Sequence, residues 1–316
     1  MDTPERTVDR TWLVAISAAL WGTDALLRKP LADALPAATV VWWEHAISLL
    51  VLLPWLPGAL RAFRRLGARE RIAVVLIGVG ASAVATALFT QAFALGDPVT
   101  PLVLQKFQPV FAMLAAYLLL GERLRSGYLW FAVPALAGAW LLTFPDPFQV
   151  SVTAARSALL ALAAAALWAG GTVLGRLVST KLTPNEVTVL RYFFGFLGAS
   201  AVVAVTGSSL AVHWGDVLGL ALLALVPGLL ALRMYYVGLR STPAARATLA
   251  ELAFPATAAV VGVTALGATL STSQWIGFAV VVLVVTGLSW HEHRTTTPVV
   301  AAPAPKENAE APARWT

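Results

Sequence analysis

The chain has 316 residues, of which 59% are hydrophobic and 12% charged, and it contains no cysteine. Soluble domains carry roughly a quarter charged residues, so most of this surface is expected to face something other than water, and disulfides and thiolate metal sites are excluded. Lysine and arginine outnumber aspartate and glutamate by 22 to 16, an excess that in so apolar a chain indicates membrane topology rather than nucleic-acid binding.

Apolar runs recur along the chain, each about 18 to 25 residues long and therefore able to cross the hydrocarbon core as a helix. The runs are continuous rather than alternating, which favours helices over a barrel. The first run lacks the pattern of a cleaved signal peptide, so we expect it to be retained. The ten predicted spans are 11–28, 37–57, 71–95, 98–120, 127–144, 155–175, 184–206, 214–239, 243–270 and 273–290.

The basic residues near the span ends predict the orientation. With a cytoplasmic N-terminus, 15 of them lie on the cytoplasmic side and three, Arg28, Lys29 and Arg156, on the outer side. This bias supports ten spans with both termini in the cytoplasm. We expect the membrane to be the inner membrane of a bacterium. Residues 291–316 are polar, rich in Ala and Pro and without periodicity, so we expect a disordered cytoplasmic tail.

The two halves of the chain resemble each other, with Trp21 corresponding to Trp168, 147 positions later. The other correspondences are Pro36 with Pro184, Phe89 with Tyr235, Pro109 with Pro255, and Gly121 with Gly267. Each half has five predicted spans, an odd number, so the second copy enters the membrane from the opposite side. Inverted repeats are common in secondary transporters, whose substrate binds near mid-membrane, although duplication has also built channels and membrane enzymes.

Three stretches of the sequence resemble the drug/metabolite transporter superfamily in its two-repeat, EamA-type branch. They are Leu20-Trp21-Gly22, LQKFQPVFAMLAAYLLLGERL at 104–124, and STSQWIGFAVVVLVVTG at 271–287. The resemblance places one repeat at 11–144 and an inverted one at 155–290. The second repeat departs from the pattern, with Gly267-Ala268-Thr269 in place of Gly121-Glu122-Arg123, but this loop element does not bear on transport.

This resemblance implies an all-α polytopic membrane protein with ten transmembrane helices, arranged as two inverted five-helix repeats around a central cavity. It implies helices 1, 3, 4, 6, 8 and 9 as the main lining, and export of amino acids or similar metabolites without ATP or a cofactor. Aromatic amino-acid exporters are the most similar members. The expected partners are a small-molecule substrate and the lipid bilayer, not nucleic acid; the oligomeric state stays open, and a monomer is plausible.

Ionisable groups inside the bilayer are costly and usually face a cavity or a partner. Asp24, Glu44 and Lys106 fall in the outer half of the membrane or near its middle, and Glu251 is the repeat counterpart of Gln105. We interpret Asp24, Lys106 and Glu251 as substrate-binding residues, and Glu44 and Glu251 as candidates for coupling. Arg191 and Arg233 lie nearer the cytoplasmic side, where snorkelling to lipid headgroups explains them.

Gln105 and Gln108 share one helix face, beside the interruption at Pro109. They are interpreted either as cavity lining or as interhelical hydrogen-bonding residues. Pro109 and Pro255 are repeat-related, so symmetric bending at these prolines is a candidate hinge for alternating access. Close packing is the simpler explanation of the two prolines.

The repeat-related Trp21 and Trp168 lie near mid-depth, where an indole face can stack on an apolar or aromatic substrate. Core packing is the alternative. Phe89 and Tyr235 are candidates for the same role nearer the cavity mouths. In one binding mode, a zwitterionic amino acid places its carboxylate near Lys106, its ammonium near Glu251 or Asp24, and its side chain against the two tryptophans.

Other classes of function are open to the same sequence. The acids Asp24, Glu44 and Glu251 also suit a multidrug or organic-cation exporter. A membrane enzyme is disfavoured because the four histidines do not cluster and no GxxxxGK[ST] loop occurs, so no catalytic or metal-binding residue is predicted. A channel requires a continuous pore or a selectivity ring, and the sequence indicates neither.

Overall fold

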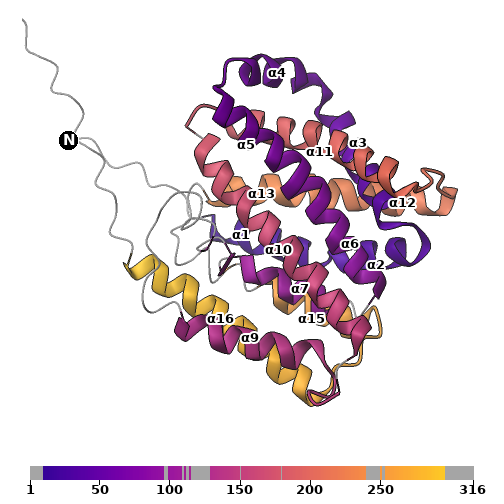
Figure 1. Cartoon of the computed structure of the whole chain (residues 1–316), viewed down its shortest axis with the longest axis vertical. Helices are drawn as coiled ribbons and strands as arrows, with labels where there is room; N and C mark the ends of the chain where they lie inside the picture. Colours follow the sequence, from indigo (N-terminus) through magenta and orange to yellow (C-terminus); the bar gives the residue numbers. More distant parts are fainter. Residues whose placement is uncertain are drawn as a thin grey trace, which may run out of the picture.

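The structure, a computed structural model, describes residues 10–95, 99–108, 110, 111, 114, 129–149, 151–178, 180–239, 250 and 253–295. All regular elements within these ranges are helical and form one bundle (Figure 1). Five of the helices are long and apolar enough to cross a membrane, namely Ala37–Arg64, Ala68–Leu95, Val152–Gly175, Pro184–Thr206 and Trp214–Tyr235. Together with the two repeats, this confirms an all-α polytopic membrane protein.

The first repeat consists of helices joined by short 3-10 and π-helical segments. In chain order, the described elements are α1 (Thr11–Gly22), α2 (Asp24–Ala34), α3 (Ala37–Leu52), η1 (Leu53–Trp55), α4 (Leu56–Arg64), α5 (Ala68–Gly78), η2 (Val79–Val84), α6 (Ala85–Leu95), α7 (Val99–Leu104), η3 (Gln105–Phe107) and α9 (Leu129–Thr143). The first helix extends beyond its predicted end at residue 28 to Ala34 and includes Pro30.

The second repeat has the corresponding elements. They are α10 (Val152–Val178), α11 (Pro184–Thr206), α12 (Trp214–Leu223), η5 (Ala224–Leu230), α13 (Ala231–Leu239), α15 (Ala253–Thr264) and α16 (Thr272–Thr295). The predicted span 184–206 matches α11 in full because local chemistry marks both of its ends. Thr183 and Glu186 form a capping box and Pro184 occupies the first turn, while Gly207 ends the helix in the left-handed conformation at a φ of 63°.

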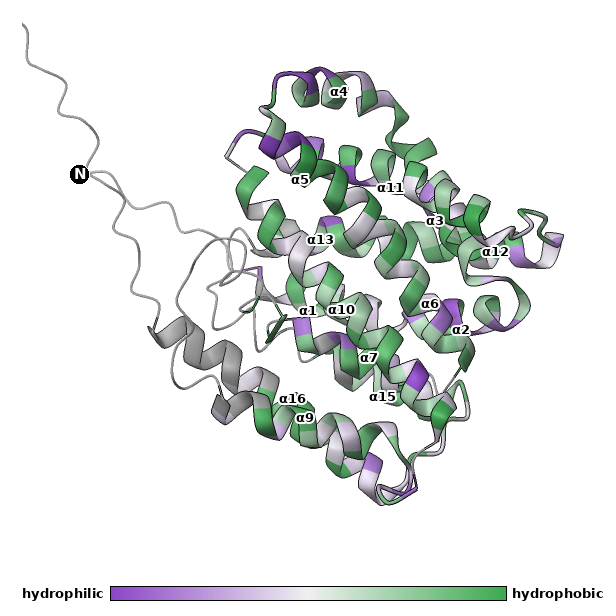
Figure 2. Ribbon diagram, in the orientation of Figure 1, coloured by the Kyte–Doolittle hydropathy of each residue, from purple (hydrophilic) through white to green (hydrophobic). Residues whose placement is uncertain are grey.

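Hydrophobic residues predominate along the helices of the bundle (Figure 2), and many of them are exposed on its outside. Leu50, Ile72 and Leu283 are 66%, 60% and 72% exposed. In a soluble protein such side chains would form large apolar patches in contact with water. Their exposure is what a bilayer requires of the outer surface.

The two repeats pack against each other in matched pairs. α3 contacts its counterpart α11 and α9 contacts its counterpart α16, while the contact of α1 with α13 is repeated by that of α10 with α6. Equivalent helices run antiparallel: Trp42 lies opposite Ser200 and Thr39 opposite Ser209. The helices α9 and α16 likewise lie side by side in opposite directions (Figure 1). This is the geometry of inverted repeats.

Both repeats interrupt their third helix with a π-helical segment, η2 in the first and η5 in the second. Segments of this kind are rare in proteins as a whole, but those that do occur are often found at functional sites. η5 contains Pro227, which explains its irregular hydrogen bonding, whereas η2 contains no proline. We have no local sequence explanation for η2, but it packs on α11 and α10 of the other repeat.

Candidate substrate and coupling site

Two aromatic pairs join the repeats at equivalent places. The ring centroids of Trp21 and Tyr235 are 5.1 Å apart, and those of Trp168 and Phe89 are 5.0 Å apart. Each pair combines the tryptophan of the first helix in one repeat with the aromatic residue of the third helix in the other. The structure therefore brings together the four aromatic candidates that the sequence singled out, as two separate pairs.

These aromatic residues surround one hydrophobic cluster between the repeats. Phe89, Phe93 and Phe254 are buried in it, and Trp21 and Trp168 pack against it while remaining half-buried. The backbones approach closely here, because a Cβ on Gly22 would lie 2.7 Å from the carbonyl oxygen of Phe254. The glycine of Leu20-Trp21-Gly22 thus allows α1 to contact α15, beside the aromatic pair of Trp21.

A buried ionic network lies next to these aromatic residues. Arg28 Nε and Nη2 donate to the two carboxylate oxygens of Asp24 at 2.6 and 2.9 Å. Arg28 Nη1 and Nη2 donate to Glu44 at 3.1 and 3.4 Å, and Nη1 also donates to Thr90 at 2.8 Å. The guanidinium therefore joins α2 to α3 and to α6.

The ionic network and the aromatic residues form one continuous site. The guanidinium carbon of Arg28 lies 5.7 Å from the ring centroid of Phe89, within the range of a cation–π interaction. The Phe89 ring also contacts the rings of Trp168 and Phe93, edge to face. An aromatic surface bordered by carboxylates and a guanidinium offers contacts both to an apolar group and to charged groups of a solute.

The burial of Arg28 corrects its interpretation as a basic residue at the outer end of the first span. Arg28 is only 3% exposed, because α2 continues past the predicted end of the first span and keeps the side chain within the bundle. The spacing of Asp24 and Arg28, four residues apart on one helix, was the available sequence signal. Only the fold shows that Glu44, 16 positions away from Arg28, completes the network.

A second polar cluster surrounds η2. His45 Nδ1 donates to the Val41 carbonyl oxygen at 2.8 Å, and its Nε2 lies 2.9 Å from Ser82 Oγ. Arg191 Nε donates to the same Ser82 hydroxyl at 3.3 Å, so Arg191 turns into the bundle instead of only snorkelling as the sequence predicted. Arg233, in contrast, is exposed. The ring of His45 also packs on that of Tyr192, with centroids 5.6 Å apart.

The remaining candidates are only partly described. Gln105 and Gln108 are half-buried at η3. The side chain of Lys106, and the residues Glu251 and Pro109, lie outside the part of the chain that the structure describes. Pro255 falls in the first turn of α15, and its side chain is likewise outside the description. Their assigned roles therefore stay predictions.

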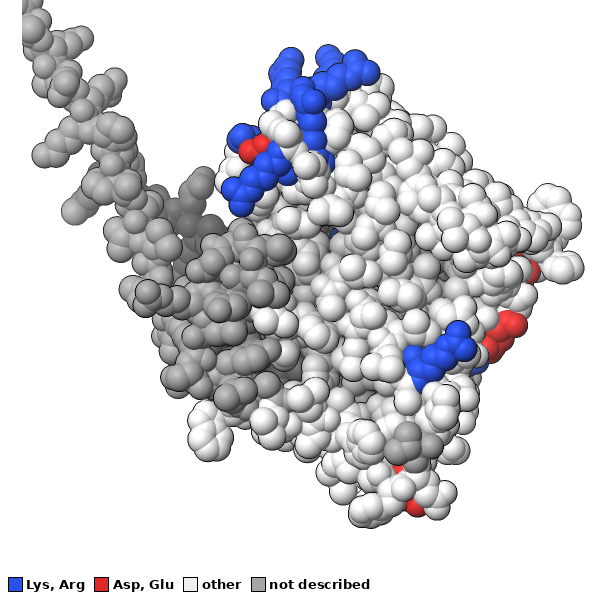
Figure 3. All heavy atoms as spheres, viewed as in Figure 1, with Lys and Arg blue, Asp and Glu red and all other residues white. Residues whose placement is uncertain are grey.

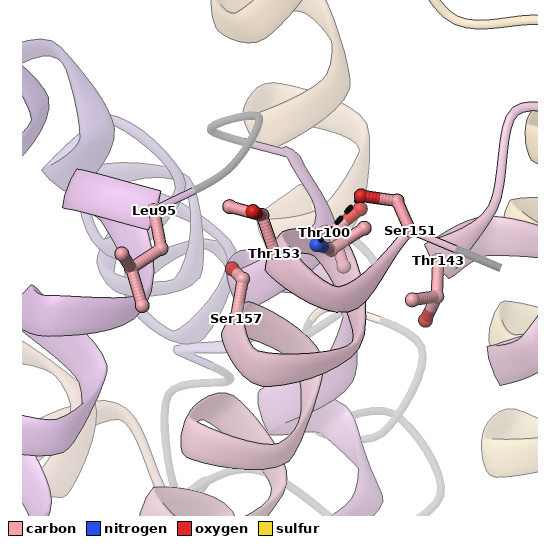
Figure 4. A pocket seen from close by; sticks show the side chains of 7 residues that line it. Leu95, Thr100, Thr143, Ser151, Thr153 and Ser157 are labelled. Carbon is pink, nitrogen blue, oxygen red and sulfur yellow. Dashed lines mark hydrogen bonds between the residues drawn. The ribbon is translucent and has the colours of Figure 1, made fainter.

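A small polar pocket (Figure 4) is lined by residues at the ends of α6 and α9 and at the starts of α7 and α10. Its volume is about 160 Å³, and Thr100, Thr143, Ser151, Thr153 and Ser157 supply hydroxyl groups to its wall. One of these hydroxyl groups already has a partner within the protein, since Ser157 donates to the Ala92 carbonyl oxygen at 2.8 Å. The volume is well below the roughly 300 to 1,000 Å³ of ordinary ligand sites, so we do not assign this pocket to the substrate.

The charged surface residues gather at two ends of the bundle (Figure 3). At one end, the exposed arginines Arg61, Arg64, Arg65, Arg69 and Arg71 lie on α4 and around the start of α5. An ion pair between Lys181 and Glu70, 2.7 Å long, connects the two repeats at this end. The ion pair of Lys29 with Asp33 belongs to α2, and α2 lies well away from α4 (Figure 1).

An all-helical membrane bundle of two inverted repeats, with aromatic and charged groups where the repeats meet, has the architecture of a secondary transporter. The comparisons with known proteins agree, because residues 11–144 and 155–290 both match the EamA-like transporter family. The chain belongs to this family, within the drug/metabolite transporter superfamily. It is accordingly a transporter and not an enzyme.

Two curated proteins and a solved structure are among the proteins similar to the chain. The "Riboflavin transporter ImpX" of Fusobacterium nucleatum is 31% identical over 261 residues, which cover 78% of this chain and 86% of that protein. The "Uncharacterized transporter YwfM" of Bacillus subtilis is 30% identical over 179 residues, or 55% and 58% of the two chains. A crystal structure with a TM-score of 0.58 and 20% identity covers 90% of this chain and 98% of its own, and so shares the fold.

Proposed function

We propose that this transporter exports small metabolites that carry an aromatic or other apolar group, with amino acids as the main substrates, by alternating access. The observation that carries this proposal is the pair of repeat-related aromatic contacts, Trp21 with Tyr235 and Trp168 with Phe89. Half-buried indoles at the meeting of two inverted repeats offer a flat surface near the place where such transporters bind solutes. The membrane is proposed to be the bacterial inner membrane, with both termini in the cytoplasm.

In the proposed binding mode, the apolar group of the solute rests between Trp21 and Trp168, and its charged groups face the polar residues around them. Asp24 is held by Arg28, so it offers the solute ammonium an acceptor that is already oriented. Lys106 would receive the carboxylate, and Glu251, Gln105 and Gln108 would complete the polar wall. Bending at Pro109 and Pro255 would move the access from one side to the other.

A second candidate substrate class comes from the similar protein named as a riboflavin transporter. Riboflavin contains a planar aromatic ring system, which the same two tryptophans can stack against. An organic cation is a third candidate, because Asp24 and Glu44 place two carboxylates beside one guanidinium. A channel would not distinguish among these solutes by saturable exchange, so the same assay also tests that alternative.

Counterflow in proteoliposomes tests the proposal. Vesicles would be loaded in turn with L-phenylalanine, L-tryptophan, L-leucine, riboflavin or a cationic dye, and the entry of the labelled solute at tracer concentration would be followed. We expect saturable entry that depends on the loaded amino acid, above that of protein-free vesicles. Exchange of riboflavin or the dye with no exchange of amino acids would show that one of these solutes, and not an amino acid, represents the substrate class. The absence of all counterflow would contradict carrier function.

A further inference from the structure

The ionic network at Arg28 has all of its donors engaged and still carries an excess of negative charge. A guanidinium has five N–H groups, and the five hydrogen bonds from Arg28 go to Asp24, Glu44 and Thr90. The side chains of Asp24, Arg28 and Glu44 are only 12%, 4% and 11% exposed. With both carboxylates ionised, the network holds two negative charges against one positive charge, away from water.

The elements that surround the network supply little further compensation within the described part of the chain. α6 contributes the uncharged Thr90, and α3 contributes His45, whose ring bonds Val41 and Ser82 instead. α11 contributes Arg191, which donates to Ser82, and Tyr192, which packs on His45. An uncompensated ionised group at low dielectric is expensive, and it is relieved by binding a cation or a proton.

We propose that the Asp24–Arg28–Glu44 network is the proton-binding site that couples transport to the pH gradient. The two carboxylates together bind one proton in one half of the transport cycle and release it in the other, and Arg28 keeps its charge throughout. This inference rests on the proposed function, because it assigns the energy source of that transport. The proton belongs to the carboxylate pair rather than to one residue, as in other closely coupled acids.

The lengths of the hydrogen bonds indicate what protonation changes. Arg28 and Asp24 lie on the same helix and are joined at 2.6 and 2.9 Å, whereas the bonds from Arg28 to Glu44 are longer, 3.1 and 3.4 Å, and cross from α2 to α3. Charge-assisted bonds weaken when a carboxylate becomes neutral. Proton uptake by the carboxylate pair therefore leaves one negative charge to balance Arg28, and the longer bonds from Arg28 to Glu44 are the ones expected to loosen, which lets α2 and α3 separate.

Glu44→Gln is the variant that tests the site, because it removes one negative charge but keeps the size of the side chain and one acceptor for Arg28. Asp33→Asn is the matched control, since it removes an acid from the same helix α2 in an exposed ion pair with Lys29. The probe is labelled L-phenylalanine in proteoliposomes. One measurement is counterflow at equal pH on both sides, and the other is uptake driven by an inside-acid gradient.

For the wild type and Asp33→Asn, we expect counterflow and an up to about tenfold accumulation for a gradient of one pH unit, the limit for one proton per solute. For Glu44→Gln we expect counterflow without accumulation. Two results would overturn the coupling site. One is accumulation by Glu44→Gln equal to that of the wild type, and the other is a wild type that exchanges phenylalanine but does not accumulate it when the pH gradient is applied.

A proton titration of the purified protein in detergent separates this inference from the proposed function. The wild type is expected to bind one more proton than Glu44→Gln between pH 4 and pH 9 on lowering the pH (about the range in which carboxylates and imidazoles titrate), and Asp24→Asn should show the same deficit. Equal proton uptake by the wild type and both variants would overturn the site even if counterflow is present. If both variants bind one proton fewer than the wild type but the wild type shows no phenylalanine counterflow, the proton-binding site would be retained and the proposed substrate class would be contradicted.

Discussion

Trp168 lies with its ring centroid 5.0 Å from that of Phe89, and this contact crosses from one repeat to the other. Its counterpart, Trp21 with Tyr235, has nearly the same separation, 5.1 Å. A core that only had to be filled would not need to keep both the aromatic character and the spacing of the pair after duplication. Conservation of the pair within one chain favours a role shared by the two halves of the transport cycle.

Replacement of Trp168 tests whether this aromatic surface receives the solute. Trp168→Ala is expected to lower the rate of phenylalanine counterflow by at least about tenfold, because stacking and buried area worth roughly 1.4 kcal/mol or more are lost. Trp168→Phe should recover part of the rate. Trp214→Ala is the control, since Trp214 is 92% exposed at the start of α12, and the assignment fails if both alanine variants behave alike.

Arg28→Gln is expected to destabilise the protein more than a change to either acid alone. It leaves Asp24 and Glu44 buried next to each other without their shared cation, and removal of one partner from a buried ion pair costs about 3 to 5 kcal/mol. Thermal unfolding in detergent would measure the loss. The double variant Arg28→Gln with Glu44→Gln should regain a clear part of the stability, and an unchanged melting temperature in Arg28→Gln would show that the network does not stabilise the fold.

A side chain at Gly22 is expected to separate α1 from α15. The Cβ of Gly22→Ala would lie 2.7 Å from the Phe254 carbonyl oxygen and 2.8 Å from Thr257 Cβ, and overpacking of this kind costs about 1 to 3 kcal/mol. Gly58→Ala is the control, because nothing lies within 4 Å of a Cβ there. A lower melting temperature for Gly22→Ala alone is the expected result, and equal stability of both variants would contradict the close contact.

Cysteine labelling can test the inverted orientation directly, because the native chain contains no cysteine. Asp33 and Lys181 occupy corresponding positions before the second helix of each repeat, three residues ahead of Pro36 and Pro184, and half of each side chain is exposed. We expect Asp33→Cys to react with a membrane-impermeant maleimide added outside intact cells, and Lys181→Cys to react only after the cells are opened. Reaction of both from the same side would contradict the proposed orientation.

Much of the fold was predictable because bilayer insertion leaves its mark on composition and periodicity. The predicted spans 184–206 and 214–239 agree with α11 and with α12 through α13. For α11 the reason is local, since Thr183, Pro184 and Gly207 mark its two ends. The first span was predicted too short, because Arg28 and Lys29 read as the end of a hydrophobic run. The charge of Arg28 is instead matched by acids inside the bundle, which hydropathy along the chain cannot detect.

The sequence by itself determined that this protein is a helical membrane protein of two repeats, and it identified the aromatic and acidic residues worth examining, because lipid exposure and duplication are properties of local sequence. Tertiary structure alone decided which of these residues meet. Phe89 of one repeat pairs with Trp168 of the other, and Glu44 on α3 accepts hydrogen bonds from Arg28 on α2. Both contacts depend on how the helices are rotated and how they cross. Those are set by packing among helices distant in sequence, which no single segment encodes.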